Sequence, residues 1–308
     1  LARAAVREAR ALCGTARLLM NGGNGAIGAP AWVHYLHAAY EPEVRSTIRT
    51  RVSAAAGRRY YLARERAALT AAPLVICNSE RTADDVGRAY RVPRSKIRVI
   101  YYGSDDTGFA PVTAGERTAA RAKLAVPEGR HAAVFIGALA DRRKGFDVLF
   151  EAWRTLALDP AWDVDLLVVG EGSEAPAWSA RAAHAGLART VRFLGFRTDV
   201  AGVLAAADVL VHPARYEAYG LGVHEALCRG IPAIVTSIAG VTERFPPTLS
   251  SLILSAPPDA RSLATTLRAW RAAAGTWRAR VAPTGDTLRH RSWDDMSAEI
   301  AAAMEAAA

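Results

Sequence analysis

The sequence predicts an α/β protein built from two Rossmann-like domains that face each other across a cleft. Short apolar runs alternate with helical segments along the chain, which is the pattern of parallel sheets. A weakly patterned stretch, 103–128, divides this alternation into two blocks. In the second block, glycine-bearing turns follow several of the apolar runs. Ligands of such folds bind at the carboxyl ends of the strands, so we expect a site there.

The first block contains expected strands at 17–20, 32–37, 74–78 and 97–102, with helices near 42–70 and 80–91. The second contains expected strands at 132–137, 164–169, 191–194, 208–212, 232–236 and 252–255, with helices near 145–158, 175–187, 199–206, 221–229, 260–274 and 290–307. We therefore expect an N-terminal domain over 1–108 and a C-terminal domain over 109–288. A last helix within 289–308 is expected to pack back on the N-terminal domain.

The length and composition fit a soluble globular protein. The chain has 308 residues, of which 51% are hydrophobic and 22% are charged, enough for two domains. No apolar run approaches the roughly 20 residues of a membrane span, and the N-terminal residues given lack the apolar core of a secretory signal. Cys13, Cys77 and Cys228 are too few and too far apart for a disulfide framework or a zinc site. We expect a cytoplasmic protein. The chain begins at Leu1, which indicates a fragment or a trimmed chain.

The positive charge is concentrated in the first block. Residues 1–108 hold 17 Lys and Arg against 9 Asp and Glu, whereas residues 109–308 hold 22 against 21. A basic helix of this kind fits peripheral contact with an anionic membrane, and it equally fits a solvated face of an arginine-rich protein. We expect no nucleic-acid partner, because no recognition motif accompanies the charge. The arginines concerned are at 45, 49, 51, 58, 59, 64 and 66, with Tyr60 and Tyr61 among them.

The most informative stretch is 215–230, which reads as a glycine-bearing turn and a helix between two strands. It carries Glu217 and Glu225, with Gly220 and Gly222 between them. A helix that opens on glycines directs free backbone N–H groups and a positive dipole end at a phosphate. Eight helical residues span about 12 Å, whereas the carboxylates of a retaining glycosidase lie about 5 Å apart. The two glutamates therefore have separate jobs, and hydroxyl groups are their natural partners.

A second turn of the same kind runs from Gly137 to Gly145 and contains Arg142, Arg143 and Lys144. Lysine occurs at only three positions in the chain, and a lysine after two arginines in a strand-to-helix turn suits a diphosphate. A third turn, Gly170-Glu171-Gly172, follows the next apolar run. It lines the base or ribose pocket, or it is a plain tight turn.

The glycine spacing at Gly23, Gly25 and Gly28 imitates a dinucleotide-binding loop. Such a site needs a helix directly after the last glycine. Here Ala29-Pro30-Ala31 and another apolar run follow, so we expect no NAD site. A loop that approaches a ligand or the other domain explains these glycines better.

Taken in order, these segments resemble the family-4 retaining glycosyltransferases of the GT-B fold (glycosyl transferases group 1). The resemblance covers roughly residues 30–300. It rests on the sequences 75–80 (VICNSE), 97–105 (IRVIYYGSD), 137–145, 168–172 (VVGEG), 191–195 (VRFLG) and 207–213 (ADVLVHP), and on Glu217 followed by Glu225. It implies transfer of a sugar from a nucleotide-diphosphate sugar, UDP- or GDP-linked, to an acceptor hydroxyl with retention of configuration. The acceptor is unknown: a glycan, a lipid or a small molecule.

The resemblance also implies roles for individual residues. Glu217 matches the glutamate that contacts the donor sugar, and Glu225 matches the one that binds the ribose hydroxyls. Lys144 matches the lysine that neutralises the diphosphate, with Arg142 or Arg143 beside it. His37 resembles the N-terminal-domain histidine that faces the donor sugar, and His34 is the alternative. The remaining donor-binding residues implied are Gly137, Gly170, Glu171, Tyr219, Gly220 and Leu221. No metal ion or other cofactor is required.

Two departures from the family pattern keep alternatives open. Ala138 stands where most relatives have an arginine, and the N-terminal domain is shorter than theirs. A truncated, non-catalytic nucleotide-sugar-binding protein is therefore one alternative. Another GT-B enzyme, such as a sugar-nucleotide epimerase, is a second. A phosphorylase is disfavoured, because it needs pyridoxal phosphate on a lysine and only Lys144 is suitably placed.

Overall fold

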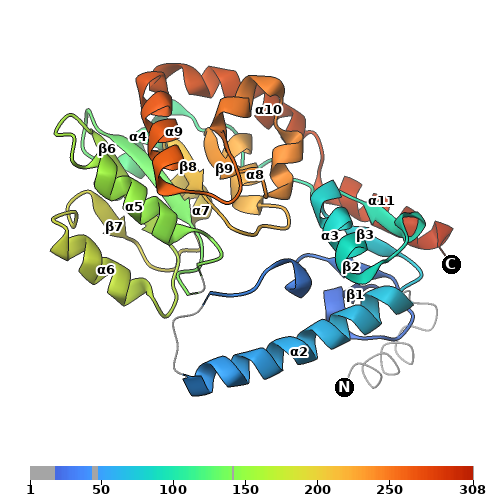
Figure 1. The fold of residues 1–308 in the computed structure, drawn as a ribbon. Helices are drawn as coiled ribbons and strands as arrows, with labels where there is room; N and C mark the ends of the chain where they lie inside the picture. The colour runs from blue at the N-terminus through green and yellow to red at the C-terminus, as the bar shows by residue number, and fades with distance from the viewer. Residues whose placement is uncertain (1–17, 44–47, 141, 308) are drawn as a thin grey trace. The chain divides into compact units, whose positions relative to one another are not determined.

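The computed structural model describes residues 18–43, 48–140 and 142–307. Contacts group these residues into two units, shown in Figure 1. The N-terminal unit comprises 18–41, 48–102 and 293–307, and the C-terminal unit comprises 42–43, 103–140 and 142–292. Apart from the short segment 42–43, the chain passes from the N-terminal to the C-terminal unit after Tyr102, a few residues before the boundary expected at 108.

The N-terminal unit contains a parallel sheet in the order β1-β2-β3-β4. Its strands are β1 (Met20–Asn21), β2 (Ala31–Val33), β3 (Val75–Cys77) and β4 (Ile97–Val99). Its helices are α2 (Ile48–Ala71), α3 (Glu80–Tyr90) and α11 (Trp293–Ala306), and short 3-10 turns lie at Gly22–Asn24, His37–Ala39 and Arg94–Lys96. Strand β3 is fully buried. The rings of Tyr102 and Trp293, 5.8 Å apart, join α11 to the end of this sheet.

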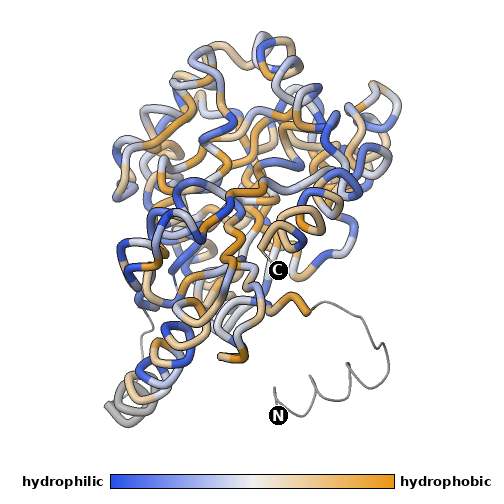
Figure 2. The backbone as a smooth tube through the Cα atoms, turned by 90° about the vertical axis from the view of Figure 1, so that its right-hand side faces the viewer, coloured by the Kyte–Doolittle hydropathy of each residue, from blue (hydrophilic) through white to orange (hydrophobic). Residues whose placement is uncertain are grey.

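The C-terminal unit contains a six-stranded parallel sheet in the order β10-β9-β8-β5-β6-β7. Its strands are β5 (His131–Ile136), β6 (Val164–Val169), β7 (Val191–Phe193), β8 (Val209–His212), β9 (Ala233–Thr236) and β10 (Ile253–Leu254). The central strands are mostly apolar and are buried on both faces, as expected of a parallel sheet between helical layers. They form the hydrophobic interior of this unit in Figure 2.

The helices of the C-terminal unit are α4 (Ala114–Lys123), α5 (Phe146–Leu156), α6 (Ala175–His184), α7 (Val200–Ala206), α8 (Leu221–Cys228), α9 (Ala260–Ala272) and α10 (Trp277–Arg289). The 3-10 turns are Gly240–Arg244, Pro247–Leu252 and Ala274–Thr276. Helix α10 packs on α8, and Gly285 permits this contact, because a Cβ there would lie 2.3 Å from the Leu227 carbonyl oxygen.

Three expectations about secondary structure were wrong. The stretch 103–128 is not a plain connector, since it contains α4, and the segment after 274 contains α10. The strand expected at 32–37 ends at Val33, and His37 begins a 3-10 turn instead. That turn forms because a buried carboxylate, Glu65, accepts hydrogen bonds from the backbone N–H groups of His37 and Ala38. An extended strand would direct successive N–H groups to opposite sides and lose one of these bonds.

Candidate donor-binding site

The candidate site lies where the chain changes direction across the C-terminal sheet. Strands β5, β6 and β7 follow one another toward one edge, and the chain then resumes with β8 on the other side of β5. The loops that leave β5 and β8 therefore start side by side, and the chain continues from them to opposite sides of the sheet, to β6 and to β9. Such a switch point at the carboxyl ends of the strands is where doubly wound sheets bind ligands.

Hydrogen bonds and one close contact hold these two loops together. The Arg215 guanidinium donates two parallel bonds to Asp147, at 2.7 and 2.8 Å, and a third to the Arg142 carbonyl oxygen at 2.9 Å. Gly145 has a φ of 73°, and a Cβ there would lie 1.8 Å from the Pro213 carbonyl oxygen. Only glycine fits this position, so the β5 loop is held directly against the start of the β8 loop.

Lys144 and Glu217 meet at this point. The Lys144 ammonium donates to Oε2 of Glu217, and Nε2 of His212 lies 3.0 Å from the same oxygen. All three side chains are mostly buried. His212 is the last residue of β8, so the strand itself fixes the position of its ring.

The surroundings of Glu217 keep it ionised. Burial by itself raises its pKa, but the hydrogen bond from His212 and the charge of Lys144 outweigh burial and hold the pKa well below its usual range. Burial lowers the pKa of His212, so its ring is neutral and must donate from Nε2 to the carboxylate. Glu217 is therefore a fixed anion beside a fixed cation.

The loop after Glu217 leads into the N-terminus of α8. Gly220 caps the helix with a φ of 109°, and its carbonyl oxygen accepts from the N–H groups of Val223 and His224. Among the described residues, no acceptor binds the N–H groups of Leu221 and Gly222. The Val241 N–H donates to the Tyr219 carbonyl oxygen at 2.8 Å and holds the loop from the side. The free N–H groups and the helix dipole make this end of α8 suited to an anion.

A buried chain of hydrogen bonds holds Tyr219 in place. Its hydroxyl lies 2.8 Å from Nδ1 of His224, whose Nε2 lies 2.6 Å from Oγ of Ser104. Ser104 donates in turn to the Leu288 carbonyl oxygen at 2.9 Å. Burial and the charge of Arg244 lower the pKa of His224 to about 4, so the ring is neutral at pH 7. Each bond in the chain can then have one donor and one acceptor.

Glu225 lies within α8 in a different environment. No described residue donates a hydrogen bond to its carboxylate, and burial raises its pKa to about 7. An unpaired, partly buried carboxylate that is half ionised near neutral pH is suited to hydroxyl donors supplied by a ligand.

The glycine turn at 170–172 packs against the turn that follows β5. A Cβ on Gly170 would lie 2.0 Å from the Gly137 carbonyl oxygen, so the loops after β5 and β6 are in direct contact. The Leu139 N–H donates to the Glu171 carbonyl oxygen at 2.9 Å. The Glu171 carboxylate accepts from the Phe196 N–H at 3.2 Å. These glycines thus allow close packing, and the donor-binding roles of Gly137, Gly170 and Glu171 stay predictions.

In the N-terminal unit, the two candidate histidines differ in their partners. Nδ1 of His34 is bonded to the Tyr102 hydroxyl at 2.5 Å, and burial lowers its pKa. Nδ1 of His37 lies 3.0 Å from Oε1 of Glu65, and 41% of the His37 side chain is exposed. His34 is thus tied to the interior of its unit, whereas His37 has a ring edge available to a ligand.

Several residues around the predicted site were not predicted from the sequence. His212, Arg215 and Asp147 hold Glu217 and the β5 loop, and Glu65 holds His37. His212 and Arg215 lie within the sequence segments singled out above, but neither was assigned a role there. Lys144 and Glu217 were each predicted from a local turn, and the structure brings them into contact. His37 and Glu217 belong to different units.

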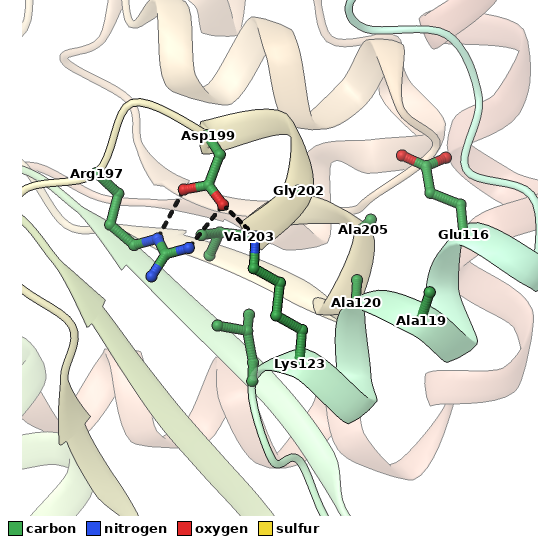
Figure 3. Close-up of a pocket in the computed structure, with 10 residues that line it drawn as sticks. Glu116, Ala119, Ala120, Lys123, Arg197, Asp199, Gly202, Val203 and Ala205 are labelled. Atoms are coloured by element: carbon green, nitrogen blue, oxygen red, sulfur yellow. Dashed lines mark hydrogen bonds and ion pairs between the residues drawn. The ribbon is translucent and has the colours of Figure 1, made fainter.

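A cavity of about 210 Å³ lies between α4 and α7 (Figure 3). Its lining is largely apolar, with Leu124 and Val203 among several alanines. Asp199 on its rim is bonded to Arg197 at 2.6 and 2.7 Å and to Lys123 at 3.2 Å. These charges are thus satisfied by one another, and the cavity shares no residue with the predicted site.

Comparison with known proteins identifies the family. Residues 130–271 match the family described as Glycosyl transferases group 1, and residues 14–107 match Glycosyltransferase Family 4. A D-inositol 3-phosphate glycosyltransferase of Corynebacterium urealyticum is 32% identical over 178 residues, which are 55% of this chain and 42% of that protein. The chain thus matches less than half the length of this relative.

Solved structures show the fold. WaaG, a glycosyltransferase of lipopolysaccharide biosynthesis, has a TM-score of 0.75 and 21% identity, over 96% of this chain and 80% of that one. Anabaena HepE, solved in complex with UDP and glucose, has a TM-score of 0.73 and 19% identity, over 90% and 71%. The chain therefore belongs to the family-4 glycosyltransferases, glycosyl transferases group 1, and has the GT-B fold.

Proposed function

We propose that this protein is a retaining glycosyltransferase that moves a sugar from a nucleotide-diphosphate sugar to an acceptor hydroxyl. The observation that carries this proposal is the contact between Lys144 and Glu217 at the switch point of the sheet. It combines a cation for a diphosphate with a carboxylate for sugar hydroxyls. The free N–H groups at the start of α8 follow a few residues later in the same loop.

The leaving diphosphate needs its growing negative charge stabilised. In our proposal Lys144 supplies a cation, with Arg142 or Arg143 beside it, and the N–H groups of Leu221 and Gly222 supply hydrogen bonds. Arg142 has a φ of 57°, an uncommon conformation for a residue other than glycine. The bond from Arg215 to its carbonyl oxygen supports that conformation.

Glu217 is better suited to binding the sugar than to attacking it. One of its oxygens already accepts from Lys144 and His212, and a carboxylate held by two donors is a poor nucleophile. Retention of configuration then requires attack from the face that the diphosphate leaves, with the leaving phosphate accepting the proton of the acceptor hydroxyl. In this proposal Glu225 binds the ribose hydroxyls, and His37 of the N-terminal unit binds a hydroxyl of the donor sugar.

The class of donor is supported by a structural neighbour, since HepE was solved with UDP and glucose. We propose a UDP- or GDP-sugar for this chain, and leave the acceptor as a hydroxyl compound of unknown class. We also propose that no metal ion takes part, because Lys144 and the neighbouring arginines supply the positive charge.

The test is the thermal stability of the protein against UDP, GDP, ADP, their sugar conjugates and NAD. A ligand at 100 times its Kd stabilises by about 2.7 kcal/mol, which is roughly 5–10 °C for a domain of this size. We expect one nucleoside diphosphate and its conjugates to raise the melting temperature and NAD to leave it unchanged. Turnover of the conjugates follows. The absence of a shift with every nucleotide would contradict the proposal.

We further propose a cytoplasmic protein that contacts the inner face of a membrane through α2. Tyr60 and Tyr61 are 56% and 54% exposed on this helix, and Arg59, Arg64 and Arg66 are exposed beside them. Aromatic and basic side chains together favour an anionic lipid surface. No helix in the described part of the chain is long and apolar enough to span a membrane. Arg45 lies outside the described residues.

The membrane proposal is tested by co-sedimentation with vesicles. We expect the protein to bind phosphatidylglycerol vesicles at low salt and to be released at high salt, because surface charges are screened. Replacement of Arg59, Arg64 and Arg66 by glutamine should weaken binding. The same replacement at the exposed Arg154, Arg181 and Arg268 of the C-terminal unit is the matched control. Equal binding by both variants would contradict a role for α2.

A further inference from the structure

The N-terminal unit contains a buried carboxylate on which four hydrogen-bonding groups converge. Glu65 lies within α2 and is 1% exposed. Its Oε1 accepts from the His37 N–H at 3.0 Å and lies 3.0 Å from Nδ1 of the same residue. Its Oε2 accepts from the Ala38 N–H at 3.2 Å and from the Tyr90 hydroxyl at 2.6 Å. Glu65 thus holds both the backbone and the ring of His37.

Only a carboxylate satisfies this arrangement. The two backbone groups are obligate donors, and one approaches each oxygen of Glu65. A glutamine would place its amide hydrogens against one of these N–H groups in either orientation. Tyr90 also donates, because burial and the hydrogen bond to Glu65 raise its pKa and keep its proton in place. Glu65 is therefore an acceptor toward all its partners.

The contact with Glu65 determines which nitrogen of the His37 ring carries the proton. A neutral imidazole has one N–H, and Nδ1 must carry it if it is to donate to Glu65. Nε2 is then a bare acceptor. The ring is stacked on Tyr61, with centroids 5.3 Å apart and planes within 8°, and it meets Tyr35 edge-on at 5.0 Å. No described residue is bonded to Nε2, so this acceptor remains for a ligand.

We propose that Glu65 is a positioning residue that fixes His37 in its Nδ1–H tautomer and presents Nε2 as an acceptor for a sugar hydroxyl. The inference rests on the proposed function for the identity of the hydroxyl compound, but the tautomer follows from the contacts of His37 alone. A carboxylate that orients an imidazole in this way acts without touching the substrate.

The loop that begins at Gly23 lies close to the same part of α2. A Cβ on Gly23 would lie 2.8 Å from the Glu65 Cα, so glycine lets this loop approach α2 at the level of Glu65. The Arg64 guanidinium donates to the Asn24 carbonyl oxygen at 2.6 Å and holds the loop there. The loop thus helps to exclude water from Glu65, which strengthens the carboxylate's hold on the ring.

The first experiment measures the tautomer directly. Two-bond ¹H–¹⁵N spectra of ¹⁵N-histidine-labelled protein at pH 8 distinguish a protonated Nδ1 from a protonated Nε2, and the His37→Gln variant assigns the signals. We expect the Nδ1–H form in the wild type, and its loss or a mixture in Glu65→Gln. The signals of His34, which has no bond to Glu65, should not move. A wild-type His37 in the Nε2–H form would overturn the proposal.

The second experiment separates positioning from a merely structural role, with UDP-glucose as the probe. We expect Glu65→Gln to lower kcat about 10–100-fold with a much smaller change in KM, the range for partners that orient a functional imidazole. In a His37→Gln background the same change should have little further effect on kcat. Tyr90→Phe, which removes a different partner of Glu65, should keep the tautomer. If the effects of Glu65→Gln and His37→Gln on the logarithm of kcat simply add in the double variant, the positioning role is wrong.

A negative result in the kinetic experiment leaves the tautomer experiment decisive. The tautomer requires no substrate, so a protein that neither binds nor turns over sugar nucleotides contradicts the proposed function while the spectrum still decides the state of His37. If Glu65→Gln does not fold, the wild-type spectrum remains sufficient to overturn the inference.

Discussion

The loop after β8 and the helix that follows it carry two glutamates with opposite surroundings. Glu217 in the loop is bonded to Lys144 and to His212, and its pKa is held well below the usual range. Glu225 in α8 has no described donor, and burial raises its pKa to about 7. Eight positions apart in one segment, one is a fixed anion and the other titrates near neutral pH.

This difference shows that the neighbours, and not the residue type or spacing, decide what each carboxylate can do. A fixed anion keeps the same hydrogen-bonding capacity at every working pH, which suits a group that orients the reacting sugar. An unpaired carboxylate becomes an acceptor at both oxygens only on ionisation, which suits a group that binds ribose hydroxyls. The predictions below test this division of roles.

The largest effect is expected for Glu217→Ala. It removes the contact with the donor sugar and also leaves Lys144 without its anion. We expect transfer to fall about 100-fold or more, because a misplaced reacting group costs about this much. Initial rates with the sugar nucleotide that the wild type uses provide the measurement, and circular dichroism confirms the fold. Wild-type turnover in this variant would remove Glu217 from the site.

Lys144→Met is expected to weaken the binding of the nucleoside diphosphate. In the free protein Lys144 is paired with Glu217, and in our proposal a diphosphate takes over this cation. Loss of a hydrogen bond to a charged group costs about 1.5–3 kcal/mol, so UDP or GDP affinity measured by calorimetry should fall about 10–150-fold. Lys123→Met is the matched control, because Lys123 is exposed and bonded to Asp199. Equal affinities in the two variants would refute the diphosphate role.

Local patterns predicted the elements of this site but not its contacts. The glycine turns placed Lys144 and Glu217 correctly after their strands. Their meeting depends on the strand order, in which β8 lies beside β5, and that order is a property of the whole sheet. His212 acts through a hydrogen bond to Glu217, and Glu65 acts through hydrogen bonds to His37, Ala38 and Tyr90, which are distant from it in sequence. No local pattern indicates such bonds.

The two missed helices have different explanations, one local and one tertiary. Helix α4 begins after Thr113, whose hydroxyl accepts from the Glu116 N–H, and the Thr-x-x-Glu spacing of a capping box was present in the sequence. Helix α10 contains Pro283 and Gly285, both typical helix breakers. Tertiary packing against α8 overrides that local preference, and it requires the glycine where the two helices come closest.

The smallest effect is expected from pH acting through Glu225. With a pKa of about 7, the carboxylate is about one tenth ionised at pH 6 and about nine tenths ionised at pH 8. Ribose hydroxyls donate better to the ionised form, so nucleotide affinity should rise with pH, by about tenfold across this window. UDP-glucose is the suitable ligand, since it lacks the terminal phosphate whose second ionisation falls near pH 6.

Variants at the two glutamates show which of them causes the pH dependence of nucleotide affinity. In Glu225→Gln the affinity should be independent of pH and close to the low-pH value of the wild type. In Glu217→Gln the dependence should persist, because Glu217 is already ionised throughout this window. Burial lowers the pKa values of His212 and His224, that of His224 to about 4. A dependence that survived in Glu225→Gln and vanished in Glu217→Gln would reverse the roles, because it would make Glu217 the titrating group and Glu225 the fixed anion.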